Sequence, residues 1–490
     1  MSQDIVVVGS GFSSLAAATT LANKGKSVTV LEKNSQAGGR ARKFSDSGFT
    51  FDMGPSWYWM PDVFENYFSK FGKRVSDYYQ LERLDPSYAV FFGQNDRIDI
   101  PANYADLQNL FESIEKGSSK QLDLFLKEAA YKYEVGMNDL VHKPSLSFLE
   151  FADWRVVSGV FKMQLFQSLS KHLTKFFSHE KLIKLMEFPV LFLGAKPQET
   201  PALYSLMNYA DIQLGTWYPQ GGMHKIVEAM VSLAEEMGVK FVFDCEVKGF
   251  EVSGNKVVAA ETNQGKFEAD SFISGADYHH TDKQILEEPF HNYSEEYWDS
   301  RKMAPSSLLF YLGINKKLKN LLHHNLFFDE DFSLHAEEIY DNPKWPSKPL
   351  FYACVPSITD KSVAPEGMEN VFLLMPVAPD LKDEEETRER YYSLIMDRLE
   401  KLTQQNIREH VVYKRSYAHS DFISDYHAYK GNAYGLANTL RQTAILKPTI
   451  VNKKLKNLYY TGQLTTPGPG VPPSLISGQV VANEVLKKLP

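Results

Sequence analysis

The stretch Asp4-Ile-Val-Val-Val-Gly9-Ser-Gly11-Phe-Ser-Ser14 decides the fold of this chain. Its β-branched run predicts a buried strand over residues 4–8, and the Ala- and Leu-rich segment 15–22 predicts a helix packed on that strand. Gly25 is expected to end the helix, and residues 27–31 are predicted as the next strand. Two strands joined by a crossover helix within about 30 residues form a βαβ unit of a parallel sheet.

The glycines between the first strand and the helix fit a dinucleotide-binding turn. Gly9 is expected to make the tight turn, and Gly11 lets the backbone approach a pyrophosphate at the helix N-terminus. Glu32 ends the second strand, where an acidic residue binds ribose hydroxyls. Ser14 replaces the third glycine of the motif, and the fold tolerates this because serine is small. The spacing therefore predicts a Rossmann-type nucleotide site.

The composition is that of a large globular protein. Its 490 residues, 43% of them hydrophobic, suggest two to four domains at roughly 100 to 200 residues each. A net charge of -8 argues against a nucleic-acid binder with a basic face. Two cysteines, Cys245 and Cys354, give no disulfide framework, and the first ten residues lack the pattern of a signal peptide. We therefore expect a reducing, cytoplasmic location.

The rest of the chain alternates between helical and strand-like blocks. Residues 61–215 are predicted to be mostly helical, because aromatic and Leu positions recur there at helical spacing. The other predicted strands are 240–248, 256–260, 267–273, 307–312, 350–355, 371–377 and 457–461, and the other predicted helices are 223–237, 384–405 and 473–489. No long apolar run of about 18 residues predicts a membrane span. No long linker separates the blocks, so we expect interleaved domains.

Two further motifs resemble those of a known protein superfamily. Glu32-Lys33 followed by Gly38-Gly39-Arg40 is similar to the flavin-binding signature of the amine oxidase and carotenoid desaturase superfamily. The segment from Gly462 through Pro467-Gly468-Pro469-Gly470-Val471 to Gly478 resembles the terminal signature of bacterial-type phytoene desaturases and related carotenoid desaturases. A Gly/Pro turn that opens a helix presents free N–H groups and a positive dipole end. In that family this helix start lies beside the flavin ring.

This resemblance covers nearly the whole chain and implies an α/β fold. It implies a Rossmann-like, GR2-type FAD-binding domain at 1–75, 220–285 and 450–490, and an interleaved mixed-sheet and helical substrate domain at 76–219 and 286–449. It implies FAD as the cofactor and no metal. The implied cofactor-binding residues are Gly9, Ser10, Gly11, Phe12, Ser13, Glu32, Lys33, Gly39, Arg40, Gly54, Pro55, Ser56, Val247, Gly462, Val471, Pro472 and Leu475.

The same resemblance implies an FAD-dependent oxidoreductase of carotenoid biosynthesis, most similar to phytoene desaturase, that acts on CH–CH bonds of a carotenoid hydrocarbon. A hydroxycarotenoid 3,4-desaturase and a flavin-dependent carotene isomerase remain open. An amine or protoporphyrinogen oxidase and a non-enzymatic prenyl-lipid carrier on the same fold are further alternatives. The motifs identify no catalytic base, and they leave oxygen, quinone or NAD open as the final electron acceptor. Asp52, Tyr58 and His224 lie near the flavin motifs, and we expect structural roles for them.

Residues 154–184 carry a separate signal, a basic amphipathic helix. The apolar positions are Trp154, Val157, Val160, Phe161, Leu165, Phe166, Leu169 and Leu173, and the basic ones are Arg155, Lys162, Lys171, Lys175, Lys181 and Lys184. Such a helix can lie on an anionic membrane surface or pack on the core with a solvated basic face. Because a carotenoid dissolves in the bilayer, we expect peripheral contact with the cytoplasmic membrane.

Two adjacent histidine pairs, His279-His280 and His323-His324, are the remaining candidates for metal ligands. Neighbouring side chains diverge on a strand, so one metal ion rarely binds both. We therefore expect no metal site.

Overall fold

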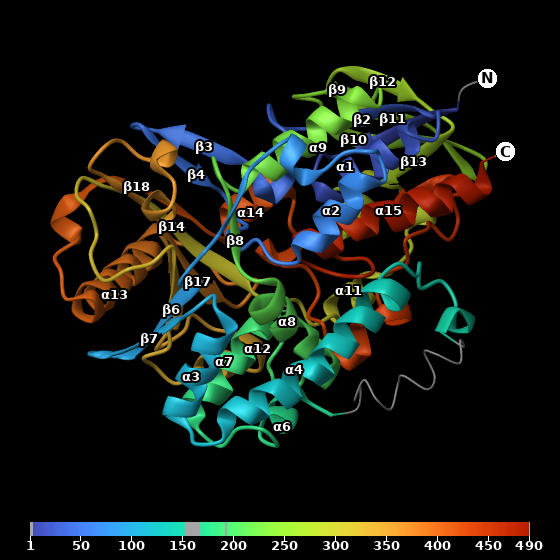
Figure 1. Cartoon of the computed structure of the whole chain (residues 1–490). Coiled ribbons are helices and arrows are strands. Elements are labelled where there is room, and N and C mark those ends of the chain that lie inside the picture. Colours follow the sequence, from blue (N-terminus) through green and yellow to red (C-terminus); the bar gives the residue numbers. More distant parts are fainter. Residues whose placement is uncertain (1–2, 152–166, 192–193, 490) are drawn as a thin grey trace.

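A computed structural model describes residues 3–151, 167–191 and 194–489 of the protein. Its described residues form a parallel sheet with the strand order β19-β13-β1-β2-β9 (Figure 1). The bounds are β1 (Asp4–Val8), β2 (Ser27–Leu31), β9 (Lys240–Val242), β13 (Ser271–Ser274) and β19 (Leu458–Tyr460). The strand at the centre is β1, whose register pairs Val7 with Val30 and with Ile273. The predicted N-terminal βαβ unit is therefore confirmed.

The two ends of the chain meet in this part of the fold. Helix α15 (Val471–Lys488) packs against α1 (Phe12–Ala22), and α9 (His224–Glu236) also contacts α1. A Cβ atom on Gly478 of α15 would lie only 2.0 Å from the carbonyl oxygen of Ser13. The close crossing of α1 and α15 thus requires glycine at this position, and it brings the C-terminal turn beside the nucleotide-binding turn.

The predicted strand 240–248 is wrong as a single element. Residues 240–242 form β9, but Asp244 adopts a left-handed conformation with φ of 52° and turns the chain away. A separate antiparallel sheet then follows, with β10 (Val247–Ser253), β11 (Lys256–Thr262) and β12 (Gly265–Glu268). The predicted strand 267–273 likewise divides between β12 and β13. The predicted strand 256–260 is confirmed by β11, and the predicted helix 223–237 is confirmed by α9.

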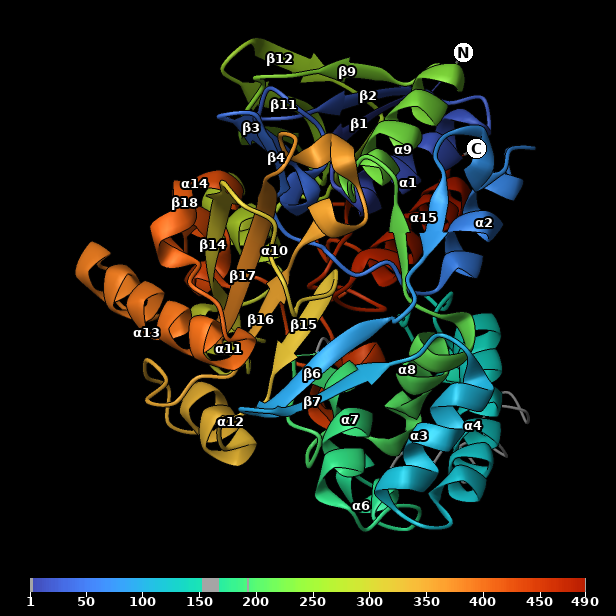
Figure 2. The same cartoon turned by 60° about the vertical axis from the view of Figure 1, so that its left-hand side comes forward.

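A larger mixed sheet stands beside the parallel one. Its order in the described residues is β18-β14-β17-β16-β15-β6-β7, and only the β15–β6 pair is parallel. The bounds are β6 (Tyr88–Gly93), β7 (Asp96–Ile100), β14 (Ser306–Ile314), β15 (His324–Phe327), β16 (Phe351–Cys354), β17 (Glu369–Val377) and β18 (Val411–Tyr417). Figure 2 shows this sheet reaching from the parallel sheet to the helical block, with α13 (Glu385–Thr403) on its outer face.

Both faces of the mixed sheet are buried, which explains why its strands are almost entirely apolar. Side chains alternate between the two faces along a strand. Leu308, Phe310 and Leu312 pack with the apolar side of α13, whereas Leu309 and Tyr311 face the opposite way, into the main core. The second face is the one that turns toward the candidate site.

The prediction of a mostly helical block over 61–215 is wrong for residues 81–100. Tyr88 to Ile100 form the hairpin β6–β7, whose turn includes Asn95 at a φ of 62°. Two small sheets pair β3 (Lys43–Asp46) with β4 (Phe49–Asp52) and β5 (Leu81–Arg83) with β8 (Trp217–Pro219). The helices of the block are α2 (Pro61–Ser69), α3 (Tyr104–Ile114), α4 (Ser118–Val135), α6 (Leu169–Leu173), α7 (Glu180–Leu191) and α8 (Leu206–Tyr209). The shorter helices elsewhere are α10 (Tyr278–His280), α11 (Glu295–Asp299), α12 (Phe332–Tyr340) and α14 (His419–Tyr426).

The predicted basic helix over 154–184 lies partly outside the described residues, which omit 152–166. From 167 onward the prediction of one continuous helix is wrong, because α6 and α7 are separate. Leu169 and Leu173 are fully buried in the core, whereas Lys171 and Lys175 are exposed. None of the helices in the described ranges is long and apolar enough to cross a membrane. The predicted domain boundaries stay a prediction.

Candidate functional site

An elongated cavity of about 480 Å³ joins the two sheets. It begins at the carboxyl ends of β1 and β2, where α/β sheets bind their ligands. From there it continues along the inner face of the mixed sheet. Its walls include every residue predicted to bind the cofactor except Leu475. Leu475 lies on α15, is 1% exposed and packs in the core, so its predicted place beside the ring stays a prediction.

The N-terminal turn has the geometry of an anion site. Gly9 adopts a φ of 83°, a left-handed conformation that favours glycine. The amide of Gly38 donates to the carbonyl of Ser10 at 3.0 Å, which holds the second glycine-rich turn against the first. Helix α1 has no side-chain cap on its first N–H groups. These unpaired donors and the positive helix end favour a phosphate at this point.

Glu32 is placed to hold a sugar diol. Its carboxylate is 4% exposed and accepts hydrogen bonds from the backbone amides of Ser10 and Asn34, both at 2.9 Å. The Ser10 hydroxyl and the Asn34 side-chain amide occupy the remaining acceptor positions, at 2.6 and 2.8 Å. These two side chains can rotate away, whereas the two backbone amides hold the carboxylate in place. Each carboxylate oxygen then has one lone pair free to accept a hydrogen bond from a ribose hydroxyl.

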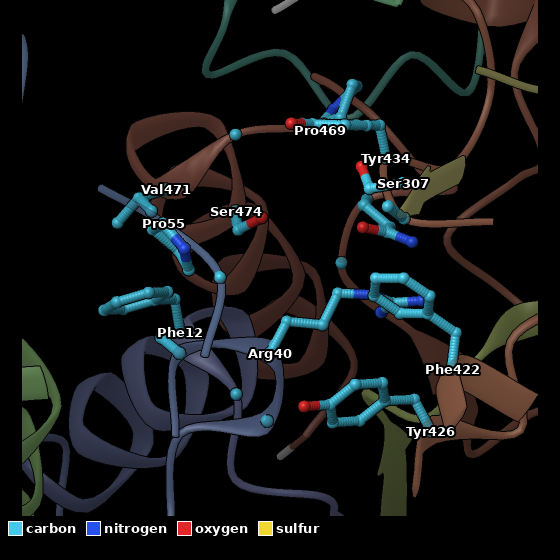
Figure 3. A pocket seen from close by; sticks show the side chains of 18 of the residues that line it. Phe12, Arg40, Pro55, Ser307, Phe422, Tyr426, Tyr434, Pro469, Val471 and Ser474 are labelled. Carbon is cyan, nitrogen blue, oxygen red and sulfur yellow. The ribbon is translucent and has the colours of Figure 1, made fainter. Parts of the chain in front are cut away.

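Arg40 reaches into the middle of the cavity, toward Phe422 and Tyr426 (Figure 3). Its Nε atom is shielded from solvent and has no hydrogen-bond partner among the described residues. Within the described ranges the guanidinium donates a single long hydrogen bond, of 3.4 Å, to the carbonyl of Asn432. Burial lowers the pKa of Arg40 because it removes water from the cation. The buried Asp277 carboxylate partly offsets this effect, but among the described residues no carboxylate lies within ion-pair distance of the guanidinium, which fits an anionic group that the cavity binds.

The C-terminal turn closes the same region. Gly470, Val471 and Pro472 line the cavity, and α15 begins at Val471 without a side-chain cap. Figure 3 shows Val471 and Ser474 beside Pro55, which belongs to the segment after β4. Ribose-type, phosphate-type and ring-type subsites therefore line one cavity, as the binding of an extended dinucleotide requires.

Beyond these subsites the cavity becomes apolar and aromatic. Its walls there come from β14 to β17, from α12 and from the helical block. The apolar lining residues include Trp59, Phe188, Met207, Leu309, Leu326, Phe328, Phe332, Ile339, Leu350, Phe372 and Leu374. Hydroxyl groups of Ser307, Tyr340 and Tyr434 interrupt this wall, and Tyr434 lies beside Ser307 (Figure 3). Such a lining suits a long apolar ligand with few polar groups.

The polar residues near the flavin motifs have structural contacts. The carboxylate of Asp52 accepts from the amides of Met223 and His224 at 2.7 and 2.9 Å, and burial raises the pKa of Asp52 to about 6. The hydroxyl of Tyr58 bonds that of Tyr79 at 2.9 Å. Asp52, Tyr58 and His224 do not line the main cavity. Their contacts agree with the structural roles expected from the sequence.

The histidine pairs differ from each other. His279 stacks on Tyr429 and His280 on His427, so the first pair diverges as expected. The rings of His323 and His324, in contrast, lie 4.5 Å apart between centroids, and with Cys354 they offer three ligand atoms within 4.8 Å of one another. The expected divergence of this pair is wrong. In the structure Nδ1 of His323 is hydrogen-bonded to the hydroxyl of Thr359, and Nδ1 of His324 to that of Tyr352.

Tyr352 and His324 are candidate functional residues that no sequence motif identified. Tyr352 lines the cavity from within the apolar run of β16, and His324 lies behind it on β15. The register pairs His324 with Cys354, so Tyr352 is its diagonal neighbour on the same face. The only signal in the sequence is a hydroxyl inside an apolar strand, and its partner becomes apparent only when the strands are paired.

Comparisons with known proteins agree with this geometry. The family model described as flavin-containing amine oxidoreductase matches residues 12–486. The chain is 40% identical over 490 residues to a carotenoid 3,4-desaturase of Haloarcula japonica, covering 99% of each chain. It is 32% identical to a 4,4'-diapophytoene desaturase (4,4'-diaponeurosporene-forming) of Staphylococcus haemolyticus, with 99% of both covered. A crystal structure of an oxidoreductase from Methanosarcina mazei has the same fold, with a TM-score of 0.66 at 16% identity over 99% of this chain and 100% of that one.

Proposed function

The chain belongs to the carotenoid desaturases within the flavin-containing amine oxidoreductases, and we propose that it introduces a double bond into a carotenoid. It is an FAD-dependent oxidoreductase. The observation that carries the proposal is the continuity of the cavity, which leads from the nucleotide subsites into a long apolar wall. A substrate without charged groups can be bound there by burial of its surface, at roughly 25 cal/mol per Å².

The residues of the chain fit FAD at defined points. The N-terminus of α1 and Arg40 would hold the diphosphate, and Glu32 would hold the adenosine ribose. The N-terminus of α15 has a positive dipole end that favours negative charge at the ring side. FAD, when bound, supplies the chemistry of accepting a hydride from a substrate C–H bond. The protein's own tasks are to align the polyene against this position and to keep water out.

We propose the 3,4 bond of a carotenoid as the site of reaction. Identity is 40% to the carotenoid 3,4-desaturase, compared with 32% and 30% to two diapophytoene desaturases. The hydroxyls of Ser307, Tyr340 and Tyr434 also suit a carotenoid that carries an oxygen function, because they place polar groups in an otherwise apolar wall; those of Ser307 and Tyr434 bond each other as well. Phytoene desaturation is the second candidate, because the turn before α15 resembles that of phytoene desaturases.

Expression in two carotenoid-producing hosts tests the choice. One host accumulates phytoene, and the other accumulates a coloured, end-hydroxylated carotenoid that is saturated at the 3,4 bond. We expect a new product with one more double bond in the second host and unchanged phytoene in the first, both identified by chromatography and mass spectrometry. Conversion of phytoene alone would favour the second candidate, and no conversion in either host despite FAD-loaded protein would contradict both.

We further propose that the helical block contacts a membrane surface, as a bilayer-dissolved substrate requires. In this block the side chains of Leu124 and Leu149 are 47% and 83% exposed, and those of Lys171 and Lys175 are exposed as well. Protein surfaces that combine exposed apolar and basic side chains bind anionic lipid. We expect co-sedimentation with vesicles that contain anionic lipid, and weaker binding of the L124S/L149S variant. Equal binding of both proteins would contradict this surface.

A further inference from the structure

A chain of hydrogen bonds leads from the cavity wall into the core. The hydroxyl of Tyr352 donates to Oγ of Ser56 at 3.1 Å and lies 2.6 Å from Nδ1 of His324, so its hydrogen can rotate from one acceptor to the other. Ser56 directly follows Pro55, which lies beside Val471 and Ser474 at the ring-type subsite (Figure 3). The Tyr352 hydroxyl is thus held where the ring side of the nucleotide site meets the apolar wall.

Contacts with several neighbouring side chains hold the ring of His324 in this position. Its ring is fully buried and stacks on Trp57, with centroids 4.0 Å apart and planes within 9°. Nδ1 contacts Tyr352, while Nε2 has no hydrogen-bond partner among the described residues. Sγ of Cys354 lies 3.8 Å from the same Nδ1. Burial raises the pKa of Cys354 to about 12, so the thiol stays neutral and adds no charge.

This arrangement needs an explanation, since an imidazole with an unpaired nitrogen is costly in a core. A leucine or phenylalanine would fill the same volume without that cost. His324 instead connects its one bonded nitrogen to a hydroxyl in the cavity wall. Buried polar groups of this kind, adjacent to a substrate cavity, are characteristic of proton transfer.

We propose that Tyr352 and His324 accept the proton that desaturation removes from the substrate. This inference rests on the proposed carotenoid desaturation. One hydrogen would leave the substrate as a hydride with both electrons, and FAD, when bound, would supply the acceptor for it. The hydrogen on the adjacent carbon leaves as a proton, and the electron pair of that C–H bond forms the new C=C bond. With the Tyr352 hydroxyl turned from Ser56 toward Nδ1 of a neutral His324 that carries its hydrogen on Nε2, the substrate proton forms an O–H bond with Tyr352 while the original hydroxyl hydrogen moves to Nδ1.

The environment of His324 also accounts for the return of the proton. Burial holds the pKa of His324 well below its usual value, because a cation there has lost its water. The protonated ring therefore releases its proton back through Tyr352 once the product leaves and water enters the cavity. A weak base suffices for the forward step, since loss of the hydride leaves positive charge on the carbon skeleton and makes the neighbouring C–H bond acidic.

The test compares Y352F with Y58F, on FAD-loaded protein and the carotenoid that the wild type converts. Both changes remove a buried hydroxyl that makes a hydrogen bond, but Tyr58 lies outside the cavity. We expect Y352F to lower kcat by about 10² to 10⁴, the usual contribution of acid–base catalysis, with KM and FAD content nearly unchanged. Y58F should keep the kcat of the wild type.

Substrate deuterated at the carbon that loses the proton gives the decisive readout. We expect a larger kinetic isotope effect on kcat in Y352F than in the wild type, because proton removal becomes slower and limits the rate. H324N should show the same change, which covers the case in which Y352F does not fold. Wild-type kcat in both variants, or a lower kcat with an unchanged isotope effect, would overturn the proposal. A wild type that converts no carotenoid would instead refute the proposed function itself.

Discussion

Replacing Arg40 with methionine is expected to have opposite effects on cofactor binding and on stability. In the described ranges the guanidinium has no ion pair, and its Nε has no hydrogen-bond partner. A hydrogen bond to a charged group contributes about 1.5–3 kcal/mol, so loss of the contact with the diphosphate should raise the Kd for FAD by about 10- to 150-fold. Titration of the apoprotein with FAD measures this change.

The same substitution should stabilise the protein without its cofactor. An unsatisfied buried donor costs about 1–3 kcal/mol, and methionine removes it while filling a similar volume. The lost contact with the ring of Tyr426, 5.2 Å from the guanidinium, offsets about 0.5–1 kcal/mol, and the lost attraction to the buried Asp277 carboxylate offsets a further part. We therefore expect the free energy of unfolding of the apoprotein to rise by about 1 kcal/mol, measured by urea denaturation.

Arg42 provides the matched control. Its Nε also lacks a partner among the described residues and it contacts the same Tyr426 ring, but it donates to the carboxylate of Asp425 at 2.6 Å and does not line the cavity. R42M should therefore lower the stability of the apoprotein and leave the Kd for FAD nearly unchanged. If R40M and R42M behave alike, or if R40M destabilises the apoprotein without weakening FAD binding, Arg40 is not an anion-binding residue and the reasoning fails.

Three further substitutions probe other parts of the cavity and fold. E32A should weaken FAD retention about tenfold or more, because the ribose loses a charged acceptor; unchanged FAD content after dialysis would contradict this. G478A should lower the free energy of unfolding by about 1–3 kcal/mol, because its Cβ would meet the carbonyl of Ser13; a wild-type urea midpoint would refute it. L350W should block the apolar wall, raising KM for the carotenoid with FAD binding intact, and an unchanged KM would exclude this path.

The N-terminal site could be predicted because its residues encode local requirements. Gly9 needs a left-handed turn, Gly11 leaves room for a ligand, and Glu32 ends the neighbouring strand, so a single βαβ unit determines all three. The C-terminal turn could be placed in the same site only through the resemblance. The turn reaches this site because Gly478 on α15 packs closely against Ser13 on α1, and these two residues are far apart in the chain.

Other features depend on tertiary pairing and could not be predicted. The hairpin at 88–100 has aromatic residues at spacings that also fit a helix, and its partner β15 lies more than 200 positions away. The Tyr352–His324 contact depends on the register between β15 and β16, which no local pattern gives. The position of the Leu475 side chain in the core could not be predicted either, because its direction around α15 depends on the packing of α15 against α1.

Anaerobic single turnover tests the central claim most directly. Purified, FAD-loaded protein is mixed without oxygen with a carotenoid saturated at the 3,4 bond, and the flavin absorbance and the product are followed together. We predict that the oxidised-flavin absorbance disappears and that one new double bond forms per flavin reduced. A flavin spectrum that stays unchanged with this carotenoid and with phytoene, in protein that retains FAD, would contradict the assignment as a carotenoid desaturase.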